Sequence, residues 1–494
     1  MSTAQVLTST KASSQRPWNS TLIRGILYGT AGLSAAAMFL DLPLPAVGGL
    51  AACLMIALLF MNVPIGVAMG TAGALALLAM RGADVMAGSF RSLPFGTAAV
   101  WSYTVVPMFI FMGLLLWRSG ITARIYDAAA KWLSWLPGGL AIGTNFAGGG
   151  MASISGSTVA TVVSLGRIGL PEMLKMNYHP RLAAGSILVA GTGGQLIPPS
   201  IYLVIFAGLV SVPVGPQLLA GLVPGLLLLV LYGAVIAAVV MAVPSLVGHV
   251  RGSRTGRVQY SWGQRLRSLT GVWPLPLLVI FIFGGMYAGY FTTTEAGAIG
   301  ALGAVVLTFT YLRPRAATVA LGKSLQGTVG STAAIFFLFI GAMIFNRALT
   351  VSGAANVVTT FIDSLGLTAV TFLLVLMVMY FLLGMIVDPL TMMLITVPLL
   401  LPSVDMLGIN LIFFGVFVVA MGELAVITPP TGMMAFIVHK IAQDPEVNLG
   451  KKVTLGDVFI GAVWFLPVPL AMLVLLIFVP EIALWIPEMM QNRD

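Results

Sequence analysis

The chain has 494 residues, of which 59% are hydrophobic and 8% are charged, and its mean hydropathy is +1.04. A soluble globular protein carries roughly a quarter charged residues, so this chain cannot cover a water-facing surface, and lipid must cover much of it. The single cysteine, Cys53, excludes intrachain disulfides and cysteine metal sites, and the three histidines show no metal-ligand spacing.

The net charge of +9 would also suit a nucleic-acid-binding protein. The lysines and arginines cluster between apolar segments, however, as they do in the cytoplasmic loops of membrane proteins. The apolar runs are continuous and do not alternate, which predicts helices and not barrel strands, with room for about a dozen spans of about 20 residues. We therefore predict a multi-pass protein of the bacterial inner membrane with no nucleic-acid partner.

In chain order, residues 1–44 are predicted to form a polar tail and one extra transmembrane helix, over 22–41. We interpret this segment as an uncleaved helix, and a signal peptide is the alternative. Two repeat units are predicted, over residues 45–243 and 271–478. A C-terminal tail over 479–494 follows them. The segment between the repeats, 244–270, is a basic loop. It contains Arg251, Arg254, Arg257, Arg265 and Arg267.

The basic loop is placed in the cytoplasm by the positive-inside rule. Counting spans outward from it puts the other basic clusters inside as well, with Arg81 and Arg91 as the exceptions.

Two segments of the chain resemble each other, GTGGQLIPPS at 191–200 and GELAVITPPT at 422–431. Pro198 falls on Pro429 at an offset of 231 (429 − 198), and at the same offset Ser157 falls on Asp388. The loop before the first segment is basic, whereas the loop before the second holds an acid and no Lys or Arg, so the two segments cross the membrane in opposite directions. Several matches at one offset predict an inverted repeat, the organisation of many secondary transporters.

The predicted fold is therefore an all-α polytopic membrane protein built from two inverted repeats. Each repeat is expected to contain three spans, a re-entrant hairpin, a broken helix and a last span. The hairpins are predicted at 138–171 and 368–402, because each is an apolar run interrupted midway by residues that disfavour helix. The broken helices are predicted at the two Gly- and Pro-containing segments, where glycine loosens the helix and proline removes an amide donor.

The candidate functional residues lie at these four interruptions. Freed backbone groups and the hydroxyls of 153–158 suit a hard cation such as sodium, although small residues there would also serve helix packing. Asp388 and Glu423 are the acids deepest in apolar surroundings, where a charge costs about 2.5–3.5 kcal/mol and needs a partner or a role. Sodium coordination, protonation and a structural ion pair all fit them. Arg347 lies outside the interruptions, where we expect it to end the third span of its repeat. It is a candidate to bind a substrate carboxylate bidentately, or an arginine that snorkels to the interface.

Five blocks of the chain, in order, resemble the large membrane subunit of tripartite ATP-independent periplasmic (TRAP) transporters of the C4-dicarboxylate type. They are ISGSTVATVVSLGRIGLPEM (154–173), GQLIPPSIYLVIFAGL (194–209), YFTTTEAGAIGAL (290–302), VDPLTMMLITVPLLLP (387–402) and ELAVITPPTG (423–432). The resemblance implies an elevator-type ion-transporter fold and sodium-coupled import of a carboxylate. It also implies two partners, a periplasmic solute-binding protein that delivers the substrate and a small membrane subunit, which we expect as a separate chain.

The resemblance also assigns roles by position. A first sodium site would use Ser155, Ser157, Thr158 and the backbone at Gly193 and Gly194. A second sodium site would use Asp388, Thr391, Gly422, Glu423 and Thr428. The substrate region would use Ser200, Arg347 and Asp388.

Two other functions are alternatives to sodium-coupled import. A proton-coupled or stand-alone carboxylate carrier would show the same spans and acids. A membrane-embedded enzyme is disfavoured, because the sequence shows no metal-binding histidine pair and no partner set for a nucleophilic serine. We therefore expect no catalytic residues, and sodium ions as the only ions or cofactors bound.

Overall fold

The computed structural model describes residues 21–248, 260–429 and 432–491, and within these ranges the regular structure is entirely helical. Most of the basic-loop arginines (Arg251, Arg254, Arg257) and two residues of the second interruption, Pro430 and Thr431, lie outside the described residues. The chain divides into two compact units. Unit 1 takes the chain up to Ala98 together with Phe336–Val358, and unit 2 takes Ala99–Ile335 and Thr359–Asp494. These units do not follow the two sequence repeats, whose boundaries stay a prediction.

Unit 1 is built from three helices and the parts of two more. They are α2 (Thr21–Ala37), α3 (Leu44–Phe60), α4 (Ile65–Ala98), the end of α16 (Pro314–Ser352) and the start of α17 (Ala354–Ser364). Helix α4 packs closely on α16 through glycine: a Cβ at Gly73 would lie 2.8 Å from the backbone of Phe345. Helix α4 also changes direction at Gly82, whose φ of 82° lies in the region that favours glycine.

Unit 2 begins with the helices that lead to the first interruption and its neighbours. They are η2 (Trp101–Thr104), α5 (Val105–Arg118), α6 (Ile121–Leu133), α7 (Gly139–Ser155), α8 (Thr158–Lys175), α9 (Pro180–Ala190), η3 (Gly193–Gln195), α10 (Ile201–Val210), α11 (Val214–Ala220), α12 (Leu222–Ala242) and η4 (Pro244–Leu246). The next three are α13 (Trp262–Leu269), α14 (Pro274–Tyr287) and α15 (Thr293–Tyr311).

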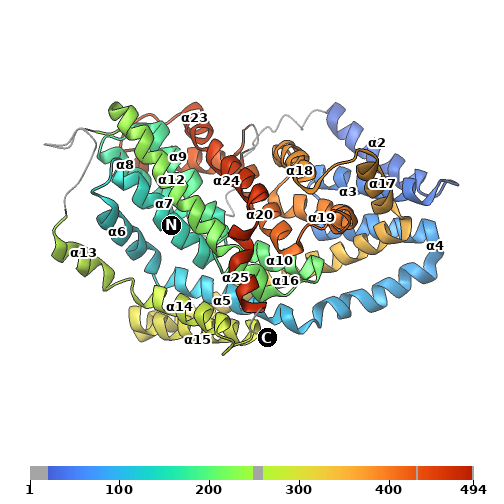
Figure 1. The fold of residues 1–494 in the computed structure, drawn as a ribbon, viewed down its shortest axis with the longest axis horizontal. Helices are drawn as coiled ribbons and strands as arrows, with labels where there is room; N and C mark the ends of the chain where they lie inside the picture. The colour runs from blue at the N-terminus through green and yellow to red at the C-terminus, as the bar shows by residue number, and fades with distance from the viewer. Residues whose placement is uncertain (1–20, 249–259, 430–431, 492–494) are drawn as a thin grey trace. The chain divides into compact units, whose positions relative to one another are not determined.

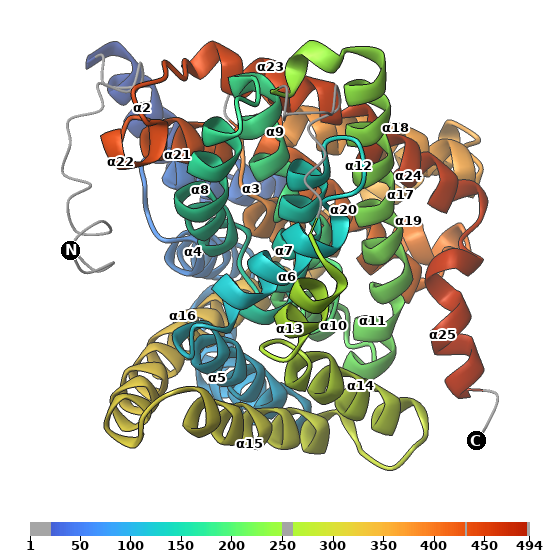
Figure 2. The same cartoon turned by 90° about the vertical axis from the view of Figure 1, so that its left-hand side faces the viewer.

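The rest of unit 2 contains the second pair of interruptions. It comprises α18 (Ala369–Gly384), α19 (Pro389–Met406), α20 (Leu411–Ile427), α21 (Met433–Ile441), α22 (Pro445–Asn448), α23 (Leu455–Phe465), α24 (Pro467–Phe478) and α25 (Glu481–Gln491). Within unit 2, α9 packs on α23 and α7 packs on α6, α8 and α9 (Figures 1 and 2).

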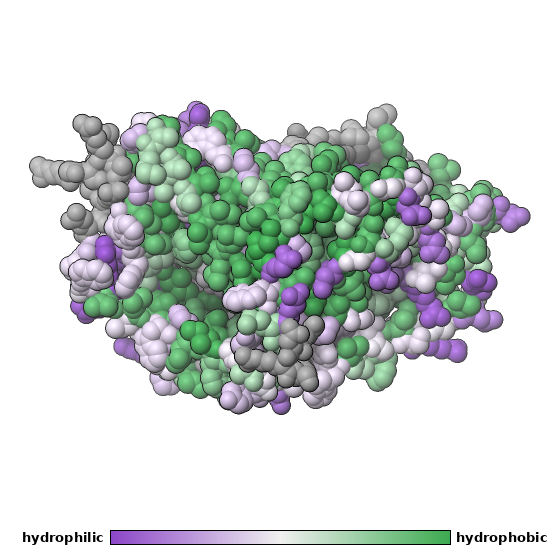
Figure 3. All heavy atoms as spheres, viewed as in Figure 1, coloured by the Kyte–Doolittle hydropathy of each residue, from purple (hydrophilic) through white to green (hydrophobic). Residues whose placement is uncertain are grey.

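Seven helices of the described part are long and apolar enough to cross a membrane, and up to nine spans result if each of two bent pairs counts as one. The sequence predicted about a dozen spans. Part of the difference lies in apolar helices of 10–17 residues, among them α10 and α20, which belong to the broken helices. Over α12 and α24 the surface is mainly hydrophobic (Figure 3), with exposed Leu226, Val230 and Phe478. Such a surface suits lipid and not water.

The predicted repeat appears in the helix ends of unit 2. Helix α8 runs 158–175 and α19 runs 389–406, so both ends differ by 231 (389 − 158 and 406 − 175). The first broken helix runs from Pro180 to Val210 and the second from Leu411 to Ile441, again 231 apart at both ends (411 − 180 and 441 − 210). The hairpins α7–α8 and α18–α19 and the two breaks therefore lie where the sequence predicted them.

The residues that start and stop these helices also correspond. Ser157 accepts a hydrogen bond from Ala160 N as the N-cap of α8, and Asp388 accepts from Leu390 N and Thr391 N as the N-cap of α19. Beyond their C-termini, Asn177 (φ 58°) and Gly408 (φ 64°) both adopt the left-handed conformation that ends helices. The repeat is thus built from equivalent local signals with different side chains.

Candidate functional site

The first hairpin turns at a short run of small hydroxyl residues. Helix α7 ends at Ser155, and Gly156 takes a φ of 59°, which lets the chain reverse within two residues. The Ser155 hydroxyl lies 3.2 Å from the Ser157 carbonyl and 3.3 Å from the Thr161 hydroxyl. The tip therefore gathers several oxygen atoms at the point where two half-helices meet.

The first broken helix lies against this hairpin. A Cβ at Gly194 would come 2.5 Å from both the Ala152 Cβ and the Gly149 carbonyl oxygen, and a Cβ at Gly191 would come 2.8 Å from Thr158 Cγ2. Only glycine permits such an approach, so Gly194 of η3 lies directly against the hairpin helix α7, whereas Gly193 faces Leu229 and Gly225 of α12. After the cis peptide bond Pro198–Pro199, Ser200 begins α10 and accepts a hydrogen bond of 3.3 Å from Leu203 N.

The second hairpin is organised around Asp388. Its Oδ1 accepts from the amides of Leu390 and Thr391, each at 3.1 Å, and its Oδ2 accepts from Thr391 Oγ1 at 2.5 Å. Asp388 is exposed, whereas Thr391 is buried. Gly422 of α20 lies beside the start of this helix, because a Cβ there would be 2.8 Å from Pro389 Cβ. The structure therefore brings Asp388, Thr391 and Gly422 together.

One hydrogen bond joins the two predicted sodium sites. Thr158 Oγ1, from the first set, donates to Glu423 Oε2, from the second, at 2.8 Å, and both side chains are buried. The other oxygen, Glu423 Oε1, is buried and has no hydrogen-bond partner in the part of the chain that the structure describes. A buried carboxylate oxygen left unpaired costs free energy unless a proton or cation satisfies it.

Two tyrosines near Glu423 were not predicted from the sequence. Tyr202, half-buried at the start of α10, lies close enough to Glu423 and Asp388 for the charges of both carboxylates to act on its hydroxyl. Tyr232 is fully buried, lies within range of Glu423, and its hydroxyl is 3.4 Å from the Thr192 hydroxyl. A signal for Tyr202 was available, since it is the only residue with a polar group in the run 201–210 and stands two positions after Ser200.

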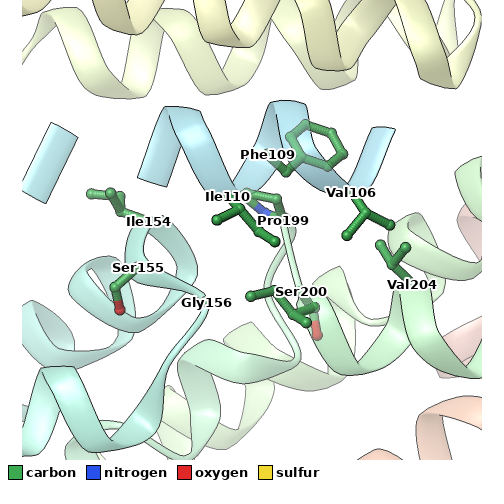
Figure 4. Close-up of a pocket in the computed structure, with 10 residues that line it drawn as sticks. Val106, Phe109, Ile110, Ile154, Ser155, Gly156, Pro199, Ser200 and Val204 are labelled. Carbon is green, nitrogen blue, oxygen red and sulfur yellow. The ribbon is translucent and has the colours of Figure 1, made fainter. Parts of the chain in front are cut away.

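A small hollow in unit 2 opens between α5 and the first pair of interruptions (Figure 4). Val106 and Ile110 of α5 lie across it from Pro199 and Val204. Its polar lining comes from the Ser155 and Ser200 region. Of the predicted substrate residues, the hollow contains Ser200 alone.

The two remaining predicted site residues lie in different units. Thr428 is buried at the end of α20, where its hydroxyl donates to the Leu424 carbonyl at 2.7 Å. Arg347 belongs to unit 1, whereas the other predicted site residues belong to unit 2. It was expected at the end of its span, but α16 continues for five residues beyond it (352 − 347). The helix continues past the exposed Arg347, and the next two residues, Ala348 and Leu349, are buried.

Hairpins and broken helices that meet at buried oxygen atoms define a class of protein, the secondary transporters with discontinuous membrane helices. The solved structure of the Alcanivorax borkumensis YdaH transporter has this fold in common with the chain, with a TM-score of 0.57 over 87% of this chain and 98% of that one. The sequence identity is 16%, so the likeness concerns the fold alone.

The chain belongs to the family described as the DctM component of the tripartite ATP-independent periplasmic transporter, which matches residues 52–482. It is thus a transporter permease subunit and a multi-pass protein of the inner membrane, as predicted. The C4-dicarboxylate TRAP transporter large permease protein DctM of Pseudomonas aeruginosa is 32% identical over 422 residues, which cover 85% of this chain and 93% of that protein.

Relatives with different substrates in their names are similar as well. The Vibrio cholerae C4-dicarboxylate large permease is 30% identical over 89% of this chain and 97% of its own length. The ectoine large permease TeaC of Halomonas elongata is 28% identical over 88% of this chain and 97% of its own length. Overall similarity therefore does not distinguish the substrate.

Proposed function

We propose that this chain is the large membrane subunit of a sodium-coupled importer of an organic acid. In this proposal a periplasmic binding protein delivers the carboxylate and a separate small membrane subunit completes the transporter. The observation that carries sodium coupling is the Glu423 carboxylate, which is 2% exposed, bonded to Thr158 through one oxygen and without a partner for the other among the described residues. A hard, oxygen-preferring cation is the ion that such an atom would bind.

The side chains and backbone around the interruptions fit that role. The first hairpin supplies the hydroxyls of Ser155, Ser157 and Thr158, with Gly193 and Gly194 alongside. The second half supplies Asp388, Thr391 and Glu423, with Gly422 packed against the start of α19. Thr428 offers its hydroxyl oxygen and backbone at the end of α20. Sodium held at both places would tie the half-helices together, so that the site moves as one body in an elevator-type cycle.

The substrate is proposed to bind next to these ions. The names of the relatives include C4-dicarboxylates, ectoine and 2,3-diketo-L-gulonate, and all three are compounds with a carboxylate group. In this proposal Ser200, whose hydroxyl caps α10, and the exposed Asp388 belong to the substrate region. Arg347 is the proposed cationic partner of the carboxylate.

The test is direct binding of ²²Na⁺ to the full chain in lipid nanodiscs. We expect saturable binding by the wild type and a large loss in Glu423→Gln, which keeps the shape of the side chain and removes its charge. Ser186→Ala is the matched control, since the Ser186 hydroxyl is buried and bonds the Leu182 carbonyl of its own helix. Wild-type ²²Na⁺ binding by Glu423→Gln would contradict the assignment of Glu423.

The runner-up, a proton-coupled or stand-alone carrier, makes different predictions. A proton-coupled carrier would bind no ²²Na⁺ and would respond to a pH gradient across proteoliposomes. A stand-alone carrier would take up its carboxylate without any binding protein.

A further inference from the structure

We infer that the Thr158 hydroxyl couples the two proposed sodium sites, so that an ion at one strengthens binding at the other. The inference rests on the proposed function and concerns its regulation. Thr158 and Glu423 stand 265 positions apart, in different repeats, and belong to different proposed sites. Their 2.8 Å hydrogen bond is a direct contact between the two sites.

The chemistry of a hydroxyl allows this coupling. A threonine hydroxyl has one proton to donate and lone pairs to accept or coordinate with. The proton of Thr158 points to Glu423 Oε2, which leaves the lone pairs for a cation at the hairpin tip. A cation on that oxygen polarises the O–H bond, so the hydroxyl becomes a stronger donor and orients Glu423, whose Oε1 is available to the second ion. Coupling of binding equilibria is reciprocal, so the second ion favours the first equally.

The contact is not an ordinary helix-stabilising one. Helix α8 is already capped by Ser157. Two other buried threonine hydroxyls of these half-helices donate to carbonyls four residues back in their own helix, Thr144 to Leu140 at 2.8 Å and Thr428 to Leu424 at 2.7 Å. Thr158 instead reaches a carboxylate of the other repeat.

The contact itself has no counterpart at the equivalent positions of the two repeats. At the repeat offset of 231, Thr158 corresponds to Pro389, which has no hydroxyl, and Glu423 corresponds to Thr192, which has no charge. Each molecule therefore holds this contact once, although the sites themselves are duplicated.

The experiment is a ²²Na⁺ binding titration on the full chain in nanodiscs, with choline replacing sodium. For the wild type we expect a Hill coefficient above 1. Thr158→Val removes the hydroxyl at nearly constant volume and should reduce the coefficient to about 1, with roughly 5- to 20-fold weaker half-saturation, within the range usual for coupled sites. Thr158→Ser keeps the hydroxyl and should retain the cooperative titration.

Thr144→Val is the matched control, because it removes a buried hydroxyl that donates to the Leu140 carbonyl of its own helix and does not contact Glu423 or Asp388 through any hydrogen bond among the described residues. If Thr158→Val kept the same Hill coefficient as the wild type, the inference would be overturned. A Hill coefficient of 1 for a wild type that still binds sodium would overturn it as well. Neither result would contradict sodium coupling itself. Absence of ²²Na⁺ binding in the wild type would instead remove the proposed function and this inference together. If Thr158→Val does not fold, loss of cooperativity in Thr158→Ser, whose hydroxyl is intact, would overturn the inference.

Discussion

Arg181 Nε lies 3.0 Å from Asp457 Oδ1, which joins the first turn of α9 in one repeat to the first turn of α23 in the other. The equivalent of Arg181 in the second repeat is Ile412 (412 − 181 = 231), and its carbonyl accepts a 3.2 Å hydrogen bond from Gln217 of the first repeat. Both broken helices are therefore fastened at their first turn by the opposite repeat. The contact of α9 is an ion pair, and the contact of α20 is a hydrogen bond from a neutral amide.

The ion pair predicts unequal effects of removing its two partners. Asp457 also accepts from Thr454 N and Thr454 Oγ1, as part of a capping box. Asp457→Ala should therefore destabilise the protein by about 1–2 kcal/mol, whereas Arg181→Ala, whose side chain is 40% exposed, should cost about 0.2–1 kcal/mol. Thermal unfolding in nanodiscs measures both changes. Equal losses would mean that the capping bonds of Asp457 contribute nothing.

The tight approach of Gly422 to the second hairpin predicts a loss of function from one methyl group. In Gly422→Ala the new Cβ would lie 2.8 Å from Pro389 Cβ, so α20 and the start of α19 must separate. We expect sodium binding to weaken by roughly tenfold or more, because ligands displaced by tenths of an ångström lose their geometry. Gly322→Ala is the control, since its Cβ would have no neighbour within 4 Å and should leave binding unchanged.

Gly408, the residue with a left-handed backbone after α19, predicts a graded loss of stability among its variants. Gly408 has a φ of 64° and its repeat equivalent Asn177 a φ of 58°. A left-handed backbone costs a residue with a Cβ roughly 1–2 kcal/mol, and less for asparagine. Gly408→Asn should therefore be tolerated better than Gly408→Ala, and Gly408→Val should be the least stable of the three. The order of their unfolding temperatures checks this, and a Val variant as stable as the Asn variant would contradict it.

The repeat was predictable because it depends on local signals that the sequence displays. Prolines, glycines and cap residues at a constant offset determine where half-helices start and stop, as the matching ends of α8 and α19 demonstrate. Positions of the hairpins and breaks follow from such signals without knowledge of tertiary packing.

Contacts between the repeats were not predictable in the same way. Nothing in the local sequence pairs Thr158 with Glu423, because their approach depends on how two half-helices pack in three dimensions. Tyr202 stands out in the sequence as the polar residue of an apolar run, but only the fold brings it close to both acids. The end of the span at Arg347 was predicted too early, because one charged residue on an exposed face does not stop a helix whose next residues are buried.

Asp388 combines two roles that its repeat equivalent does not. Ser157 caps α8 with a hydroxyl alone, whereas Asp388 caps α19 with a carboxylate that binds two amides and the Thr391 hydroxyl. Asparagine caps a helix about as well as aspartate, so Asp388→Asn should change the free energy of unfolding by less than about 1 kcal/mol. Asp388→Ser would give α19 the same N-cap residue that Ser157 provides for α8 in the first repeat.

Sodium binding should respond differently from stability in these variants. Asp388→Asn and Asp388→Ser both remove a negative charge from the proposed second site, which should weaken ²²Na⁺ binding by roughly tenfold or more, equivalent to about 1.4 kcal/mol. Thermal unfolding and ²²Na⁺ titration of the same nanodisc preparations separate the two effects. A chain that unfolds as the wild type does and still binds sodium with unchanged affinity would reduce Asp388 to a helix cap. The second site would then depend on Glu423 as its only acid.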